Sequence, residues 1–144
     1  MLGKLSRFMR IMGYDTLYPN LEIPDTELIK YAIDTNRKLI SRDREICRRY
    51  RDSILIESDN LKMQIVQIAS IDPPDQTKLF SRCTVCNGLL IPGNGGCNEE
   101  YDPKKKDQVT HCQDCGKCYW PGTHSESVLK FLQSLELYTE YNKQ

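Results

Sequence analysis

Residues 38–58 read KLISRDREICRRYRDSILIES, and this stretch decides the fold class of the chain. The runs KLIS and SILIES have the apolar composition of short strands, and the charged segment between them has the length of a short helix. Strands joined by a helical crossover run in the same direction. The stretch therefore predicts an α/β fold with a parallel sheet.

The segments around this stretch continue the alternation. Apolar residues recur at helical spacing in three of them, and a fourth, short segment resembles a strand. Helices are expected over residues 1–13, 24–36 and 59–70, and a strand over 15–18. Gly13 should end the first helix, because glycine readily adopts the left-handed conformation that follows a helix C-terminus.

A segment with prolines then interrupts the pattern. Residues 71–78 read IDPPDQTK and are interpreted as a linker, because adjacent prolines do not continue a helix or a strand. We therefore expect two domains, over residues 1–78 and 79–144. A last helix, with Thr123 and Glu126 in a capping box, is expected to pack back on the first domain.

Composition narrows the class of protein. Only 39% of the 144 residues are hydrophobic, and the chain has no long apolar run, which argues against a membrane span and a signal peptide. We expect a soluble cytoplasmic protein. The net charge is zero, but residues 1–51 hold 11 Lys and Arg against 7 Asp and Glu, while the remainder holds 9 against 13. The basic half permits contact with a polyanion, although such surfaces are often only solvated.

Four of the seven cysteines form two CxxC pairs that are separated by 25 residues. The pairs consist of Cys83, Cys86, Cys112 and Cys115. Turn residues follow each pair, so two tight turns can aim four thiolates at one ion. A closed shell of four sulfurs suits a structural zinc ion. A redox pair or a coincidence is the alternative, but redox chemistry needs no second CxxC.

The other three cysteines are interpreted as non-ligands. Cys118 follows Cys115 closely enough to substitute for it, and Cys97 lies in a loop rich in Gly, Pro and charge. Cys47 falls on the apolar side of the helix expected after the strand KLIS, and is expected in the core.

Three acids occupy positions where a catalytic ion would bind. Asp43 and Asp59 each follow a predicted strand, and Asp25 lies at the start of the preceding helix. Ligands of parallel α/β sheets bind beyond the carboxyl ends of the strands. Carboxylates there suit Mg²⁺ or Mn²⁺, which would activate water against a phosphate, while Arg42 would keep Asp43 ionised and contact phosphate. The alternative is that the three acids only cap helix N-termini.

Several strings, taken in order, resemble one family. They are MLGKLSRFMRIMGYDTLY, PDTELIKYA, LISRDREI, SRCTVCNGLL and CQDCGKCYWPGTH. Over nearly its whole length the chain is similar to the Mut-seven C-terminal RNase family. That resemblance implies a PIN-like nuclease domain with a Rossmann-like sheet, an acidic metal-dependent ribonuclease site, a zinc ribbon and RNA as the substrate.

The resemblance also implies roles for individual residues. The acids of the family site correspond to Asp25, Asp43 and a later acid, Asp59. Lys4 and Arg7 match a basic helix beside that site and would bind nucleic acid; with Arg10, they are otherwise the solvated face of an amphipathic helix. His124 matches a position of the family's zinc ribbon. Its role is either functional or limited to capping or packing.

The family further has a short strand that ends in an Asp immediately before the first helix, and the sequence begins at Met1, where that strand would end. Two hypotheses follow. One is a ribonuclease that acts with such a strand. The other is an RNA- or protein-binding module that retains the scaffold and the ribbon with impaired catalysis. No oligomeric state is predicted.

Overall fold

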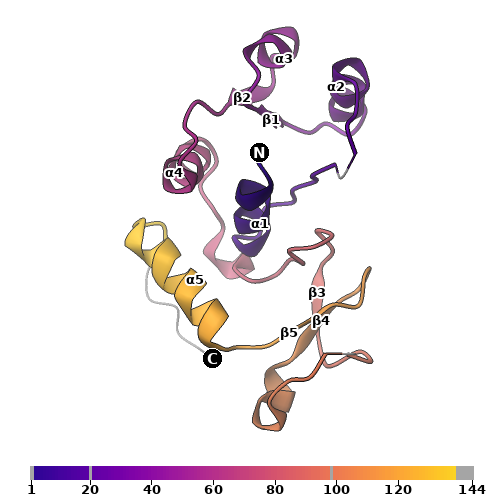
Figure 1. Cartoon of the computed structure of the whole chain (residues 1–144), viewed down its shortest axis with the longest axis vertical. Coiled ribbons are helices and arrows are strands. Elements are labelled where there is room, and N and C mark those ends of the chain that lie inside the picture. The colour runs from indigo at the N-terminus through magenta and orange to yellow at the C-terminus, as the bar shows by residue number, and fades with distance from the viewer. Residues whose placement is uncertain (1, 20, 98, 139–144) are drawn as a thin grey trace.

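The structure, a computed structural model, describes residues 2–19, 21–97 and 99–138 (Figure 1). Its elements form a mixed α/β arrangement, as the stretch 38–58 predicts. In chain order they are α1 (Gly3–Ile11), α2 (Asp25–Asp34), β1 (Leu39–Ser41), α3 (Arg44–Arg49), β2 (Ser53–Leu55), α4 (Leu61–Ile71), the 3-10 helix η1 (Gln76–Lys78), β3 (Leu90–Pro92), the 3-10 helix η2 (Pro103–Gln108), β4 (Thr110–Cys112), β5 (Cys118–Tyr119) and α5 (Thr123–Ser134).

The first sheet consists of β1 and β2, which run in parallel and are joined by α3. Leu39 lies opposite Ser53, and Ser41 lies opposite Leu55. The parallel direction is therefore confirmed, although β2 ends earlier than the apolar run SILIES. Beyond the end of β2, the backbone N–H of Ile56 still donates to Ser41 O at 2.8 Å.

The second sheet is antiparallel, has the order β3-β4-β5 and forms part of what we call the ribbon, residues 82–120. Leu90 lies opposite Cys112, and Thr110 lies opposite Tyr119. Two tight turns of the ribbon carry the paired cysteines. We call them the first knuckle, residues 83–88, and the second knuckle, residues 112–117.

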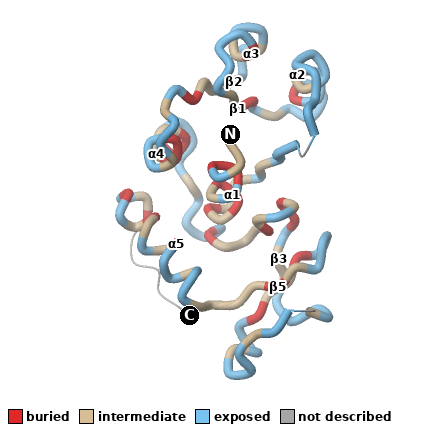
Figure 2. The backbone as a smooth tube through the Cα atoms, viewed as in Figure 1, coloured by how far each residue is buried: buried red, intermediate tan, exposed pale blue. Residues whose placement is uncertain are grey.

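One apolar core lies between α1, α4 and α5. Phe8 on α1 packs edge-on against Phe131 on α5, with ring centroids 5.4 Å apart. Figure 2 shows buried residues along α1, α4 and α5, whereas α2 buries only Ala32. The return of the last helix to the N-terminal part is confirmed, and the division into domains 1–78 and 79–144 stays a prediction. The buried core residues are Leu5, Met9, Met12, Ile56, Ile65, Ile68, Leu79, Val128, Leu132, Leu135 and Tyr138.

The strand expected over residues 15–18 is wrong, because these residues form no strand. Their polar groups are satisfied differently. The backbone N–H of Thr16 donates to the side chain of Asn87 at 3.0 Å, and Thr16 O accepts from Arg10 Nε at 2.9 Å. Side chains, and not a neighbouring strand, thus provide the partners of this segment.

The helix ends agree with the sequence in part. Gly13 has φ +94° just after α1, as a helix stop requires. The capping box expected with Thr123 as N-cap is wrong, because the N-cap of α5 is Gly122, which has no side chain to accept a hydrogen bond, and Ser125 Oγ accepts from the N–H of Gly122 at 2.9 Å. No helix in the described ranges is long and apolar enough to cross a membrane.

Candidate metal centre and acidic edge of the parallel sheet

The two knuckles bring four thiols into one cluster. The Sγ atoms of Cys83 and Cys115 are 3.6 Å apart, and those of Cys86 and Cys112 are 3.4 Å apart. All four Sγ atoms lie within 4.8 Å of one another. Zinc–sulfur bonds of about 2.3 Å in a tetrahedron place sulfurs about 3.8 Å apart. The donor set therefore fits a structural metal ion such as zinc.

Each knuckle has the turn that its sequence predicts. The N–H of Asn87 donates to Cys83 O at 3.0 Å, and that of Gly116 donates to Cys112 O at 3.1 Å. Asn87 and Gly116 both have positive φ, at 72° and 78°. At Gly88 a Cβ atom would lie 2.6 Å from Cys112 Sγ, so only glycine allows the knuckles to approach this closely.

Burial and hydrogen bonds make the four thiols unequal. Cys83 is buried, and its Sγ lies 3.1 Å from the hydroxyl of Tyr119. Burial raises the pKa of Cys83, but hydrogen bonds from Tyr119 and from backbone N–H groups outweigh it and lower this pKa to about 7. Burial, followed by the neighbouring thiols, raises the pKa of Cys86. Four thiolates therefore need a shared cation to exist together.

Two cysteines of the ribbon stand apart from this cluster. Cys97 and Cys118 form a disulfide, and neither belongs to the four-thiol group, so their interpretation as non-ligands is confirmed. Cys47 is half-buried and not in the core cluster, contrary to the expectation. His124 is exposed near the start of α5.

Arg10 lies against the first knuckle and is 6% exposed, although the sequence places it on the solvated face of α1. Its Nη1 donates to the carbonyls of Thr84 and Val85 at 2.9 and 3.2 Å. Burial lowers the pKa of Arg10, and the nearby thiols of Cys83 and Cys86 act in the opposite direction. The spacing contains a signal for this burial, because Arg10 belongs to the buried side of α1 together with Ser6, one turn earlier.

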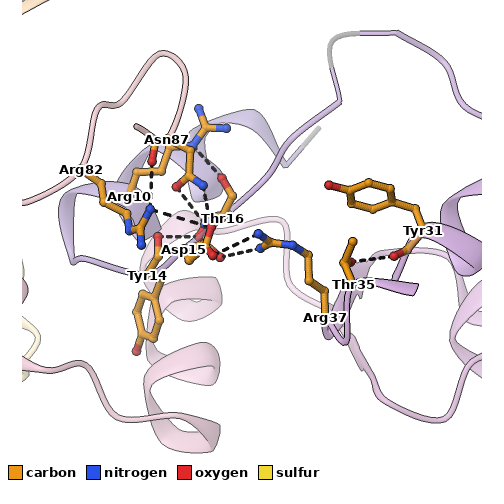
Figure 3. A network of polar contacts seen from close by, with 9 residues as sticks. All are labelled: Arg10, Tyr14, Asp15, Thr16, Tyr31, Thr35, Arg37, Arg82 and Asn87. Atoms are coloured by element: carbon orange, nitrogen blue, oxygen red, sulfur yellow. Dashed lines mark hydrogen bonds and ion pairs between the residues drawn. The ribbon is translucent and has the colours of Figure 1, made fainter. Parts of the chain in front are cut away.

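Asn87, in the same knuckle, contacts the segment after α1 (Figure 3). Its Nδ2 donates to Asp15 Oδ1 at 2.7 Å, and its Oδ1 accepts from the N–H of Thr16. Asp15 also pairs with Arg37 at 3.0 Å and with Arg82 at 3.9 Å. Partial burial raises the pKa of Asp15, but the hydrogen bonds from Asn87 and Arg37 outweigh it and lower this pKa. We call the contacts of Arg10, Asp15, Thr16 and Asn87 the joint.

Asp43 and Asp59 follow the two strands of the parallel sheet, Asp43 after β1 and Asp59 after β2, which ends at Leu55. Asp43 lies two residues after β1, and its Oδ1 accepts from the N–H of Glu45 at 2.8 Å as the N-cap of α3. Asp59 is exposed and follows β2, and Asn60 rather than Asp59 caps α4. The capping role expected for Asp43 is confirmed, and that expected for Asp59 is wrong.

Asp25 belongs to α2, the helix that precedes β1, and not to the segments that follow the two strands. It is the first residue of α2, whose N-cap is Pro24, and its carboxylate pairs with Arg49 at 3.8 Å. Arg49 is the last residue of α3, whereas Asp43 lies at the start of that helix. The four cysteines are the one group of three or more potential metal ligands that the described ranges bring this close, and the three acids form no such group.

The basic residues predicted to bind RNA are exposed. Lys4 and Arg7 lie on the outer side of α1, and Arg42 lies between β1 and α3. Arg44, on the other side of Asp43, pairs with Glu57 at 3.4 Å. Positive side chains are thus present beside the carboxyl end of β1 and on α1.

Comparison with known proteins supports the family resemblance that the sequence strings from MLGKL to CQDCGKCYWPGTH suggest. The family model of the Mut7-C RNAse domain matches residues 1–132. No curated protein and no solved structure matches the chain significantly. The family indicates a nuclease-type function with RNA as the substrate. The match covers most of the sequence, and the chain therefore belongs to the Mut7-C RNAse domain family.

Proposed function

We propose that the protein is a metal-dependent ribonuclease that hydrolyses phosphodiester bonds of RNA. The observation that carries this proposal is the match to an RNAse domain over residues 1–132. The parallel pairing of β1 and β2 supports a site at the carboxyl edge of the sheet, where α/β folds bind ligands. A PIN-like fold and the domain division at residue 78 belong to the same proposal.

The acids at this edge would hold Mg²⁺ or Mn²⁺. Asp43 and Asp59 supply carboxylates from the ends of adjacent strands, and Asp25 supplies a third from α2. The bound ion would lower the pKa of a water molecule and neutralise charge on the scissile phosphate. A rearrangement that brings the three carboxylates together would accompany ion binding, because hard cations require several oxygen ligands.

The basic residues would hold the RNA backbone. Arg42 is next to Asp43 in the sequence, and its guanidinium is suited to bidentate contact with a phosphate. Lys4 and Arg7 on α1 would bind phosphates farther along the strand. Because the contacts are to the backbone, we expect binding to weaken as salt concentration rises.

The four cysteines would hold zinc with a structural role. All four ligand positions are thiolates from the protein, so the ion has no open position for substrate. Zinc would fix the two knuckles against each other and so hold the fold of the ribbon.

A cleavage assay with matched variants tests the ribonuclease proposal. Asp43→Asn retains an N-cap, because Asn caps helices about as well as Asp, but it removes a charged metal ligand. Asp75→Asn is the control, since Asp75 also caps a short helix and accepts from Thr77 N at 3.0 Å. With labelled single-stranded RNA and Mn²⁺, we expect cleavage by the wild type and Asp75→Asn, and little by Asp43→Asn. Equal cleavage by both variants would remove Asp43 from the mechanism.

A second candidate function is an RNA- or protein-binding module with impaired catalysis. It is favoured by the structural roles of two acids, the capping by Asp43 and the ion pair of Asp25 with Arg49. This candidate predicts RNA binding in a filter assay without cleavage in Mg²⁺ or Mn²⁺. RNA cleavage that depends on Asp43 contradicts it.

A further inference from the structure

Arg10 connects α1 to the metal centre. Its Nη1 donates to the carbonyls of Thr84 and Val85, the two residues between the first pair of cysteines. Its Nε donates to Thr16 O at 2.9 Å. One side chain therefore holds together the end of a helix, the segment that follows it and the turn between two candidate metal ligands; Figure 3 shows Arg10 beside Thr16 of that segment.

The environment of Arg10 depends on the shape of the first knuckle. A buried guanidinium is costly unless its donors and its charge have partners. The carbonyls of Thr84 and Val85 are partners only while the knuckle keeps its turn. Four thiolates around a divalent ion leave a net negative charge, which is a favourable counter-charge for the neighbouring cation.

We propose that Arg10 is a positioning residue through which metal binding at the four cysteines orders α1, the helix that carries Lys4 and Arg7. Asn87 strengthens the same connection, because its side chain bonds to both Asp15 and Thr16. The RNA-binding role of Lys4 and Arg7 rests on the proposed function, whereas the coupling between the metal and α1 does not.

The physical reason for the coupling is the short length of α1. The helix has nine residues, and helices of this length are marginal without tertiary contacts. Without the metal, the thiols lose their common ion and the knuckle loosens, so the buried guanidinium loses fixed acceptors. The C-terminal end of α1 then loses one of its attachments, and the helix opens more often.

Hydrogen exchange of the full chain tests this proposal, with Zn²⁺ bound and after removal of Zn²⁺ by a chelator. In the wild type we expect the amides of α1 to exchange several-fold faster after metal removal, while those of α3 change little. Arg10→Gln should exchange at similar rates in α1 with and without Zn²⁺. Its Zn²⁺ affinity, measured by competition with a chelating dye, should fall about 10-fold to 100-fold, the range for groups that support metal ligands from outside the ligand set.

Arg37→Gln is the matched control. Arg37 is a guanidinium that also holds the segment after α1, because it pairs with Asp15 at 3.0 Å, but among the described residues its guanidinium bonds to Asp15 and not to the first knuckle. We expect this variant to retain the Zn²⁺ affinity and the metal-dependent protection of α1. The proposal is overturned if Arg10→Gln behaves as Arg37→Gln does. It is also overturned if Zn²⁺ removal leaves α1 exchange in the wild type unchanged, a result that does not depend on whether any variant folds.

These readouts separate the coupling from the ribonuclease proposal. Exchange and Zn²⁺ affinity are measured without RNA and without Mg²⁺ or Mn²⁺. A protein that shows the coupling but cleaves no RNA contradicts the proposed function alone. A protein that cleaves RNA but shows no coupling contradicts the inference about Arg10 alone.

Discussion

Asn87 donates its side-chain amide to Asp15 at 2.7 Å across 72 positions of the sequence. Asn87 directly follows the first CxxC pair, and Asp15 lies two residues beyond the glycine that ends α1. The residue that allows the knuckle to turn thus also fixes the segment after α1. A candidate metal site and a helix that are far apart in the sequence consequently share one set of polar contacts.

Asp15→Asn should lower stability in a pH-dependent way. The substitution keeps an oxygen acceptor for Asn87 but removes the charge that pairs with Arg37. The Asp15 side chain is 48% exposed, so solvent screening limits the expected loss to about 0.5–1 kcal/mol at pH 7. Because the folded pKa is lowered, this contribution is present above the unfolded pKa and is lost as pH falls through the folded value.

Urea unfolding of both proteins between pH 7 and pH 3 measures this effect. The stability difference should narrow as the pH falls below about 4, where the unfolded carboxyl group begins to bind a proton. A difference that stays constant down to pH 3 would show that the charge of Asp15 is not its source.

Asn87→Ala should destabilise the protein more than Asn87→Gly. Both substitutions remove two partly buried hydrogen bonds, which costs about 1–3 kcal/mol. Asn87 has φ +72°. In this left-handed conformation alanine is strained by a further ~1–2 kcal/mol, whereas glycine is not. Chemical denaturation of the two zinc-loaded variants gives the difference. Equal stability of the two would mean that the turn has relaxed away from the left-handed conformation.

Local patterns predict the elements whose interactions are local. The spacing of Leu5, Met9 and Met12 predicts α1 and its buried side, and the CxxC spacing predicts the knuckles because each knuckle forms within six residues. The joint is different, because Arg10 and Asn87 find their partners more than 70 positions away. The spacing along α1 indicates the burial of Arg10, but no local pattern identifies the distant residues to which Arg10 and Asn87 bond.

The acids show a second limit of sequence reasoning. A helix N-cap and a metal ligand at a strand end require the same residue type at the same position, so the sequence alone does not separate the two roles for Asp43. The structure confirms the cap. The strand expected over 15–18 illustrates the related difficulty, since a strand requires a partner in space and these residues bond to side chains instead.

Leu132→Ala should destabilise the whole core and not only the C-terminal part. Leu132 on α5 is fully buried and belongs to the cluster that contains Leu5 and Ile65. Its truncation should cost about 2–5 kcal/mol through lost burial and a cavity. Leu89→Ala is the control, because Leu89 is 49% exposed. If hydrogen exchange rises in α5 but not in α1 and α4, residues 79–144 form a separate cooperative unit, as the two-domain prediction implies.

Tyr119→Phe should weaken the metal centre and shift its acid sensitivity. The Tyr119 hydroxyl lies 3.1 Å from Cys83 Sγ and helps to lower the pKa of that thiol to about 7. Its removal should raise the pKa of Cys83, so that protons compete with the metal at higher pH. We expect zinc affinity to fall about 10-fold and the pH at which half the zinc is released to rise.

Zinc release into a chelating dye during a pH titration measures this shift, with Tyr101→Phe as the control. Tyr101 also belongs to the ribbon, but its hydroxyl contacts Asn94 and not a cysteine. The control should release zinc at the same pH as the wild type. If Tyr119→Phe does so as well, the hydroxyl contributes nothing to the stability of the Cys83 thiolate. Zinc binding then depends on the knuckle backbone and the four sulfurs alone.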